Sequence, residues 1–319
     1  MNKLSTSTTL LQSPENGSVQ TVPPLSSDLV KAVRTGECIL FLGAGVHYPP
    51  DDKDPTYGGC YPESIRPPVG SELANLLYKD TDLKIDPDYG WKAKLAIARN
   101  LQRMSLYYEI KKGSKKELVK KVKQEIIPNK QPSRALKALA QLDFPIICTT
   151  NYDNLFEKAL ILAGKNPNVS SYSNQPTAAT KDYVERRTPP ADNPFLFKIH
   201  SDIDDPTESI VITDEDYIQF ILRMMTGVGM YDPIPMVFRS HMQIWPMLFI
   251  GFSLMDYNLR LLFKLLGWNI PHPKHSYSVG PYPDGLIRKT YDPPVKFIVQ
   301  DVWDFVPKLY IAVTGMPMP

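Results

Sequence analysis

Short apolar runs that end in polar or glycine-rich turns recur along the chain. Cys38–Leu42 is continuously apolar and opens into Gly43-Ala44-Gly45, and Phe144–Cys148 leads into the polar run Thr149–Asn154. A third run, Phe195–Ile199, ends at His200. An apolar run bounded by proline or turn-forming residues is typical of a buried strand. Each run therefore predicts a strand that carries site-type residues at its carboxyl end, where open α/β sheets bind ligands.

Segments with helical spacing alternate with these runs. Between the first two runs, such spacing dominates residues 71–142, with candidate helices at Glu72–Tyr78, Trp91–Ile110, Lys116–Ile127 and Ser133–Leu142. Three later runs predict further strands at Met247–Gly251, His275–Val279 and Val295–Val299. This alternation predicts an α/β fold, a Rossmann-like parallel sheet flanked by helices. Residues 71–142 then form a helical insertion after the first strand.

Two segments lack a regular apolar pattern. Residues 1–26 are rich in Ser, Thr, Gln and Pro, which predicts a flexible tail before a single domain at 27–319. The segment from His47 to Gly70 is rich in proline and directly follows the glycine turn. A loop of this length inside a compact domain is usually functional or mobile. We expect it to close over a ligand.

Composition narrows the class of protein. The chain has 319 residues, 43% of them hydrophobic, and a net charge of +2, which predicts a soluble globular protein without global attraction to nucleic acid. The densest basic segment, Lys111 to Lys123, is interpreted as a solvated helix face. The three cysteines include no CxxC pair, so no zinc module is predicted and a reducing compartment is favoured. No signal peptide and no membrane-spanning run are visible, so we expect a cytoplasmic protein that contacts no membrane.

The glycine turn is a candidate phosphate site. A strand that runs into Gly43-Ala44-Gly45 lets backbone N–H groups approach a phosphate closely. The third glycine of a GxGxxG fingerprint is missing, and proline-rich loop rather than helix follows. The pattern therefore argues against an ordinary Rossmann dehydrogenase. A tight strand-end turn without a ligand remains an alternative.

Three polar residues at strand ends are candidates for chemistry. The amide of Asn151 can hold a ribose hydroxyl or a water, and Asp153 can orient that contact. An Asx turn with a helix N-cap is the alternative for both, and it is the favoured interpretation of Asn154. His200 has an ordinary pKa of about 6.5, which suits a general base near neutral pH. The other histidines, His47 among them, show no supporting pattern and receive no role.

Four motifs in order resemble the sirtuin superfamily over roughly residues 28 to 305. They are Phe41–Gly45, Thr150–Asp153, Lys198–His200 and Gly251–Leu254. Within that superfamily the chain looks most similar to the SIR2-like proteins of bacterial anti-phage defence. That likeness rests on the stretches Val211–Tyr217 and Gly251–Asp256.

The resemblance implies an NAD+ site that needs no metal. Gly43, Ala44 and Gly45 would hold the pyrophosphate, and Asn151 and Asp153 would hold the nicotinamide-side ribose and a water. His200 would act as base. The remaining NAD+-binding positions implied by the resemblance are Thr150, Gly251, Ser253 and Asp256, with Ser253 on the adenosine side.

The chain departs from the protein-deacylating sirtuins in two respects. It cannot supply four zinc-binding cysteines, and Ser201 replaces the glycine that follows their histidine, where a side chain could crowd the site. The resemblance thus implies an NAD+ glycohydrolase that depletes NAD+ during infection. Such an enzyme must be silent at rest, so control is expected from homo-oligomer assembly or from a partner such as a HerA-like ATPase or a short Argonaute. A zinc-less deacylase and a non-enzymatic scaffold for NAD+ or ADP-ribose are the alternatives.

Overall fold

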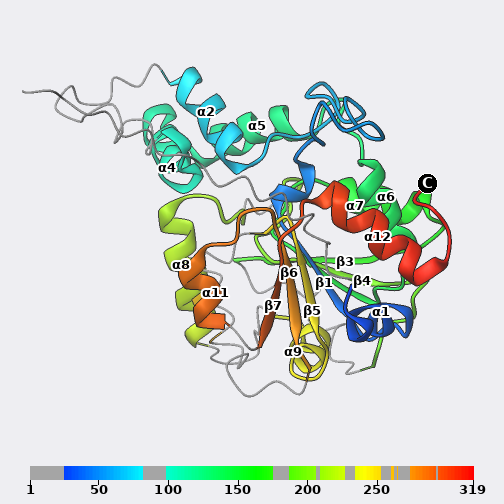
Figure 1. Ribbon diagram of the computed structural model, residues 1–319. Helices are drawn as coiled ribbons and strands as arrows, with labels where there is room; N and C mark the ends of the chain where they lie inside the picture. Colours follow the sequence, from blue (N-terminus) through cyan, green and yellow to red (C-terminus); the bar gives the residue numbers. More distant parts are fainter. Residues whose placement is uncertain are drawn as a thin grey trace, which may run out of the picture.

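A parallel seven-stranded sheet forms the centre of the molecule (Figure 1). The computed structural model describes residues 25–81, 98–174, 187–205, 209–226, 234–252, 260–261, 264, 274–291 and 294–319. The strand order is β3-β4-β2-β1-β5-β6-β7. The strands are β1 (Ile39–Leu42), β2 (Ile146–Thr149), β3 (Asn168–Ser171), β4 (Phe195–Lys198), β5 (Met247–Ile250), β6 (Ser276–Val279) and β7 (Val295–Ile298). The predicted α/β fold is confirmed.

Alternate side chains of the central strands enter two separate cores. In β1, Leu40 and Leu42 pack into one core, whereas Ile39 and Phe41 pack into the other. Both faces are apolar because helices cover both, as parallel sheets require. The first face is covered by α1 (Ser27–Arg34), α6 (Arg134–Gln141), α7 (Leu155–Leu162) and α12 (Val302–Thr314). The second face is covered by α8 (Asp214–Thr226), α9 (Met236–Met242) and α11 (Gly285–Tyr291).

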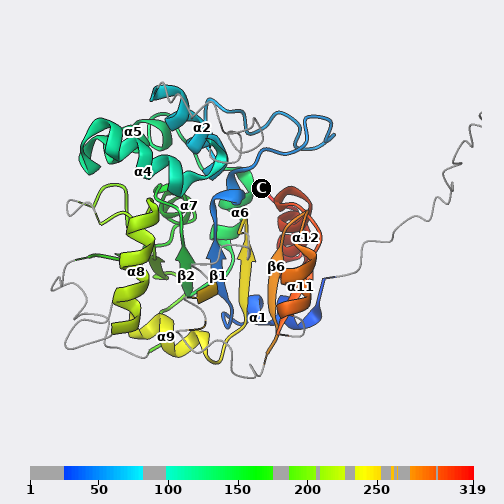
Figure 2. The ribbon, with the colours of Figure 1, turned by 90° about the vertical axis from the view of Figure 1, so that its left-hand side faces the viewer.

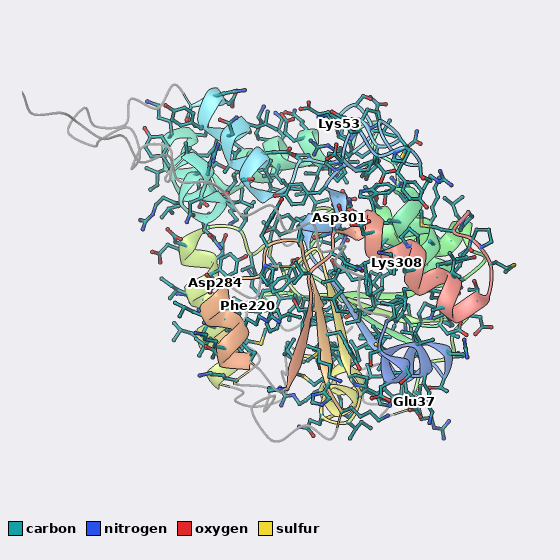
Figure 3. All side chains as sticks on the ribbon, in the orientation of Figure 1. Glu37, Lys53, Phe220, Asp284, Asp301 and Lys308 are labelled. Carbon is teal, nitrogen blue, oxygen red and sulfur yellow. The ribbon has the colours of Figure 1, made fainter. Side chains whose placement is uncertain are left out.

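A third helical group lies beyond the carboxyl ends of the strands. It contains α2 (Gly70–Asp80), α4 (Leu101–Lys112) and α5 (Lys115–Ile126), drawn at the top of both ribbon views (Figure 2). These helices form their own apolar cluster with Ile203, Ile210 and Ile212. Glu37 lies at the opposite end of the sheet from Lys53, which follows the glycine turn (Figure 3). The helical group thus covers the end of the sheet at which the candidate residues lie.

Helix boundaries differ from the prediction in two places. The predicted helix Trp91–Ile110 is interrupted, because α4 begins at Leu101 and the side chain of Asn100 caps it by accepting from the Arg103 N–H at 2.9 Å. Residues 91–97 lie outside the described residues. A single 3-10 turn, η1 (Ala44–His47), begins within the glycine turn and ends at the first residue of the predicted loop.

Two further predictions concern the domain bounds and the absence of a membrane-spanning segment. The proposed tail at 1–26 and the domain at 27–319 stay predictions, because residues 1–24 lie outside the described residues. Among the helices that the structure describes, none is both long and apolar enough to cross a bilayer.

Candidate functional site

The glycine turn lies where the strand order reverses. The chain leaves β1 for β2 on one side, and β5 lies on the other, which is the position at which open α/β sheets bind ligands. The Gly45 N–H donates to the Gly251 carbonyl at 2.8 Å. Gly251 has a φ of +67°, and a Cβ there would lie 2.0 Å from the Val46 nitrogen. Only glycine at 251 allows the ends of β1 and β5 to touch in this way.

A large cavity of about 650 Å³ opens beside this turn. Ala44, Gly45 and Gly251 line it, so three of the predicted NAD+-binding residues face one space. The volume is within the range of small-molecule and cofactor sites. Aromatic side chains dominate its wall, namely Tyr48, Phe252, Tyr282, Phe297 and Trp303.

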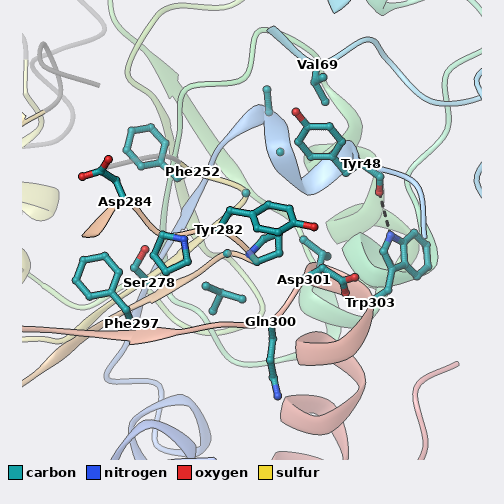
Figure 4. A pocket seen from close by; sticks show the side chains of 18 of the residues that line it. Tyr48, Val69, Phe252, Ser278, Tyr282, Asp284, Phe297, Gln300, Asp301 and Trp303 are labelled. Carbon is teal, nitrogen blue, oxygen red and sulfur yellow. Dashed lines mark hydrogen bonds between the residues drawn. The ribbon is translucent and has the colours of Figure 1, made fainter. Parts of the chain in front are cut away.

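Among the described residues, two charged side chains line the large cavity, and both are acidic. Asp284 accepts hydrogen bonds from the backbone of Leu286 and Ile287 at 2.9 Å, at the start of α11. Asp301 caps α12 by accepting from the Asp304 N–H at 2.8 Å. On the same helix, the Trp303 indole donates to the Tyr48 carbonyl at 2.9 Å, which ties the segment after the glycine turn to the cavity wall (Figure 4).

Asn151 and Asp153 lie after β2, around a small void of about 10 Å³. His47 joins them there, although the sequence assigned it no role. Its Nε2 is 3.2 Å from Asp153 Oδ2 and 3.3 Å from Asn151 Nδ2. The side-chain amide oxygen of Asn151, Oδ1, is buried and has no hydrogen-bond partner among the described residues. Thr150 lies beside them, with its N–H donating to the Leu42 carbonyl at 3.1 Å.

Opposing effects act on the pKa of Asp153. Burial raises the pKa of the carboxyl, but nearby His47, a hydrogen bond from the Leu155 N–H and the Lys198 ammonium together hold it below its usual range. The Leu155 N–H donates to Asp153 Oδ1 at 2.9 Å and not to the side chain of Asn154. The predicted capping role of Asn154 is therefore wrong, because its side chain makes no cap hydrogen bond.

A buried ammonium fixes the backbone of this polar turn. Lys198 is fully buried at the end of β4, and its Nζ donates to the carbonyls of Tyr152 at 3.2 Å and Asp153 at 2.8 Å. It also pairs with Glu157 at 3.2 Å and with Asp202. Burial lowers the pKa of Lys198, but these carboxylates outweigh it and hold the pKa above its usual value. Burial raises the pKa of Glu157 to about 7 despite the ammonium.

His200 lies apart from both cavities. Its ring meets Tyr217 edge-on at 5.1 Å and Phe220 at 5.7 Å between ring centroids, and its Nδ1 is 3.4 Å from the Tyr217 hydroxyl. Burial lowers the pKa of His200 to about 3. The imidazole is therefore neutral at pH 7, but in this conformation it is a weak base under an aromatic cover.

Ser201 adopts a backbone conformation that favours glycine. Its φ is +71°, in the left-handed region, and its side chain is fully buried. The hydroxyl donates to Asp205 Oδ2 at 3.0 Å, and neither described cavity includes it. Ser201 thus occupies a backbone conformation that glycine adopts more readily than serine.

Two predicted NAD+-binding residues, Ser253 and Asp256, lie outside the described residues. Gly43 lies at the turn, with its N–H donating to the Ile250 carbonyl at 3.0 Å. Within the described part of the chain, no group of three His, Cys, Asp or Glu side chains is placed to hold a metal ion.

Comparison with known proteins identifies related sequences. Residues 145–294 match the family model of the SIR2-like domain. The chain is 26% identical to NAD(+) hydrolase ThsA of Enterococcus faecium over 240 residues, which cover 75% of this chain and 41% of that protein. NAD(+) hydrolase ThsA of Bacillus cereus strain MSX-D12 is 34% identical over 123 residues, covering 39% of this chain and 22% of that protein. The matches thus span less than half the length of these relatives.

Proposed function

We propose that this chain, which matches the SIR2-like domain over residues 145–294, is an NAD+ glycohydrolase that releases nicotinamide and ADP-ribose. One observation carries the proposal: the side-chain amide oxygen of Asn151 is buried at a strand end near the glycine turn and has no partner among the described residues. A buried acceptor without a partner costs free energy unless a ligand supplies the donor. A ribose hydroxyl or an ordered water is such a donor.

The chemistry requires positioning more than strong acid catalysis. The bond between nicotinamide and ribose breaks with its electron pair moving to the pyridinium nitrogen, so the leaving group departs neutral. A water attacks the oxocarbenium-like carbon and passes its proton to a base, the role proposed for His200. Asn151 would hold the ribose or the water, and Gly43, Ala44 and Gly45 would present the backbone to the pyrophosphate. The large cavity would take the adenosine side.

The position of His200 supports control of this activity. In the conformation seen here, Tyr217 and Phe220 cover the imidazole, so a rearrangement must expose it before it can accept a proton. A chain that consumes cellular NAD+ must be silent at rest. We therefore assign activation to assembly of identical chains or to a separate partner protein, within a response that depletes NAD+ in infected cells.

The test is nicotinamide release from NAD+ without any acyl peptide. Wild type is compared with Asn151→Ala and His200→Ala, each alone and with candidate partners. We expect both substitutions to lower kcat by at least about 100-fold, the scale of losing one transition-state contact or a general base. Asn154→Ala is the matched control, since that neighbouring amide also has a buried oxygen without a partner but lies outside the proposed site. Equal turnover in all four proteins would contradict the assignment.

Burial of His200 favours one competing function, a scaffold that binds NAD+ or ADP-ribose without turnover. A group with a pKa of about 3 under two aromatic rings is unsuited to proton transfer unless the site rearranges. Calorimetric binding of NAD+ in each assembly state distinguishes the two. Tight binding with no nicotinamide release in every state would establish the scaffold.

A further inference from the structure

His47 is buried at the junction of three groups whose hydrogen-bonding demands conflict. Its exposed fraction is 2%, and its Nε2 faces both an acceptor, Asp153 Oδ2 at 3.2 Å, and a donor, Asn151 Nδ2 at 3.3 Å. One ring nitrogen cannot serve both, because Nε2 either carries a proton and donates or lacks one and accepts. Whether Nε2 carries a proton therefore decides whether His47 donates to Asp153 or accepts from Asn151.

The other ring nitrogen is already assigned by its neighbours. The Tyr61 hydroxyl has a single proton, which it donates to the Gln131 carbonyl at 3.0 Å. His47 Nδ1, 3.4 Å from the same oxygen, must therefore carry a proton in order to bond to it. Tyr61 thus fixes Nδ1 as protonated in both charge states of the ring. Nε2 alone changes when His47 ionises.

We propose that His47 is a positioning residue whose protonation sets which end of the Asn151 amide faces the substrate. In neutral His47, Nε2 accepts from Asn151 Nδ2, and the amide oxygen remains available to a ribose hydroxyl or a water. In cationic His47, Nε2–H donates to Asp153, and Nδ2 would meet an N–H. The amide then turns over, and a donor replaces the acceptor that the reaction needs. This inference rests on the proposed function of Asn151.

The charged and titratable groups that face His47 come from three elements. Asp153 follows β2 and faces Nε2, whereas Tyr61 comes from the segment after the glycine turn and faces Nδ1. Glu157 of α7 lines the same small void, and its pKa of about 7 places its titration in the relevant range. Lys198 binds the Asp153 carbonyl and stabilises the turn. An experiment must therefore separate His47 from Glu157.

The first test is kcat and KM for nicotinamide release by the activated protein at pH 8. His47→Gln provides a neutral amide near the Nε2 position and should keep kcat within about fivefold of the wild type, with KM changed less because the large cavity is untouched. His47→Leu should lose about tenfold or more in kcat, the scale of one lost hydrogen bond (about 1.4 kcal/mol for a tenfold change).

Glu157→Gln is the control for the neighbouring carboxyl of the same small void. In a Glu157→Gln background, His47→Leu should still lose about tenfold in kcat relative to His47→Gln. Equal kcat in His47→Gln and His47→Leu, or a difference that disappears in the Glu157→Gln background, would overturn the proposal. Losses in His47→Leu that merely follow a lowered melting temperature, with His47→Gln equally impaired, would show a structural role only.

A second test needs no turnover and so remains decisive if the isolated chain is silent. With ¹⁵N labelling, the Asn151 side-chain amide is assigned by its loss in Asn151→Asp. A ¹⁵N–¹⁵N coupling across the hydrogen bond from Asn151 Nδ2 to His47 Nε2 should be present at pH 8. It should vanish when the His47 ring nitrogens report protonation. Absence of the coupling at pH 8, or its persistence on the protonated ring, would refute the positioning role whatever the activity assay shows.

Discussion

Two regions at the carboxyl end of the sheet are built on opposite principles. Around Asn151, charged and polar groups are packed so closely that only about 10 Å³ remains empty, and an ammonium, three carboxyls and an imidazole contact one another. Beside Gly251, aromatic side chains and glycines enclose about 650 Å³. In the first region, hydrogen bonds fix the positions of the side chains. In the second region, glycines, which have no side chain, leave space for a ligand.

The difference separates two tasks of a nucleotide-cleaving site. Affinity for a large ligand comes from apolar wall and backbone access, which tolerate small shifts. Positioning of a reacting group requires side chains held by their neighbours, and buried polar networks hold them only when every member is paired. We therefore expect substitutions in the packed region to be costly when they leave charges unpaired. Substitutions beside the large cavity should lower stability only where the new side chain would clash with neighbouring atoms.

The largest effect is expected from Lys198→Met. This change leaves Glu157, Asp202 and two backbone carbonyls without their buried donor, so the free energy of unfolding should fall by about 3–5 kcal/mol. Denaturant titration measures it. The control is Lys123→Met, whose exposed pair with Asp204 should contribute less than about 1 kcal/mol. Equal losses in the two variants would remove the distinction between the regions.

Gly251→Ala should be the next most damaging change. The positive φ and the 2.0 Å approach of a Cβ to the Val46 nitrogen predict a loss of about 2–4 kcal/mol in unfolding free energy, together with weaker NAD+ binding. Gly280→Ala tests the opposite case in the same cavity wall, because a Cβ there meets nothing within 4 Å. If calorimetry and denaturation find the two variants alike, space does not limit this region.

Acid should destabilise the protein through His200. Its pKa in the folded state is about 3, below the ordinary 6.5, so the unfolded chain binds a proton that the folded chain refuses. This contribution is complete above pH 6.5 and is lost as the pH falls toward 3, by up to about 1.4 kcal/mol per pH unit. Between pH 6 and pH 4, wild type should lose about 2–3 kcal/mol more than His200→Gln. Parallel stability curves for the two proteins would show that His200 is not buried as a neutral ring.

The smallest effect concerns the choice of dinucleotide. Asp284 and Asp301 supply the charges in the lining of the large cavity, and its described wall contains no Lys or Arg to pair with a 2′-phosphate. We expect NAD+ to be preferred to NADP+. The double variant Asp284→Asn, Asp301→Asn retains capping side chains and should improve relative NADP+ affinity by roughly fivefold, from about 1 kcal/mol of relieved repulsion. The same ratio in Asp304→Asn as in the double variant would point to a non-specific charge effect.

The strands and their polar ends could be predicted because they depend on local sequence. The run Cys38–Leu42 contains β1, and the run Phe144–Cys148 contains all of β2 except its last residue, since a buried parallel strand needs continuous apolar residues. The interruption before Leu101 follows from a short-range cap at Asn100 that the apolar spacing obscured. Local signals therefore define which elements form and roughly where they end.

The partners of the site residues could not be predicted in the same way. His47 occupies a short turn at the start of a proline-rich segment, and its contacts with Asn151 and Asp153 span more than 100 residues of sequence. The aromatic cover of His200 likewise comes from α8, a separate helix. Only the positive φ of Ser201 had a sequence signal, namely that a glycine occupies the matching position of the related motif.

The hydrogen bond from the Trp303 indole to the Tyr48 carbonyl has an optical consequence. The ring belongs to the wall of the large cavity and packs near Tyr57, at 5.5 Å between centroids. Indole emission responds to the polarity and mobility of its surroundings, so a dinucleotide that fills this space should change the colour and the polarisation of the fluorescence. Trp303 fluorescence should therefore report binding of the dinucleotide in the large cavity, and stopped-flow measurements can follow it without an added label.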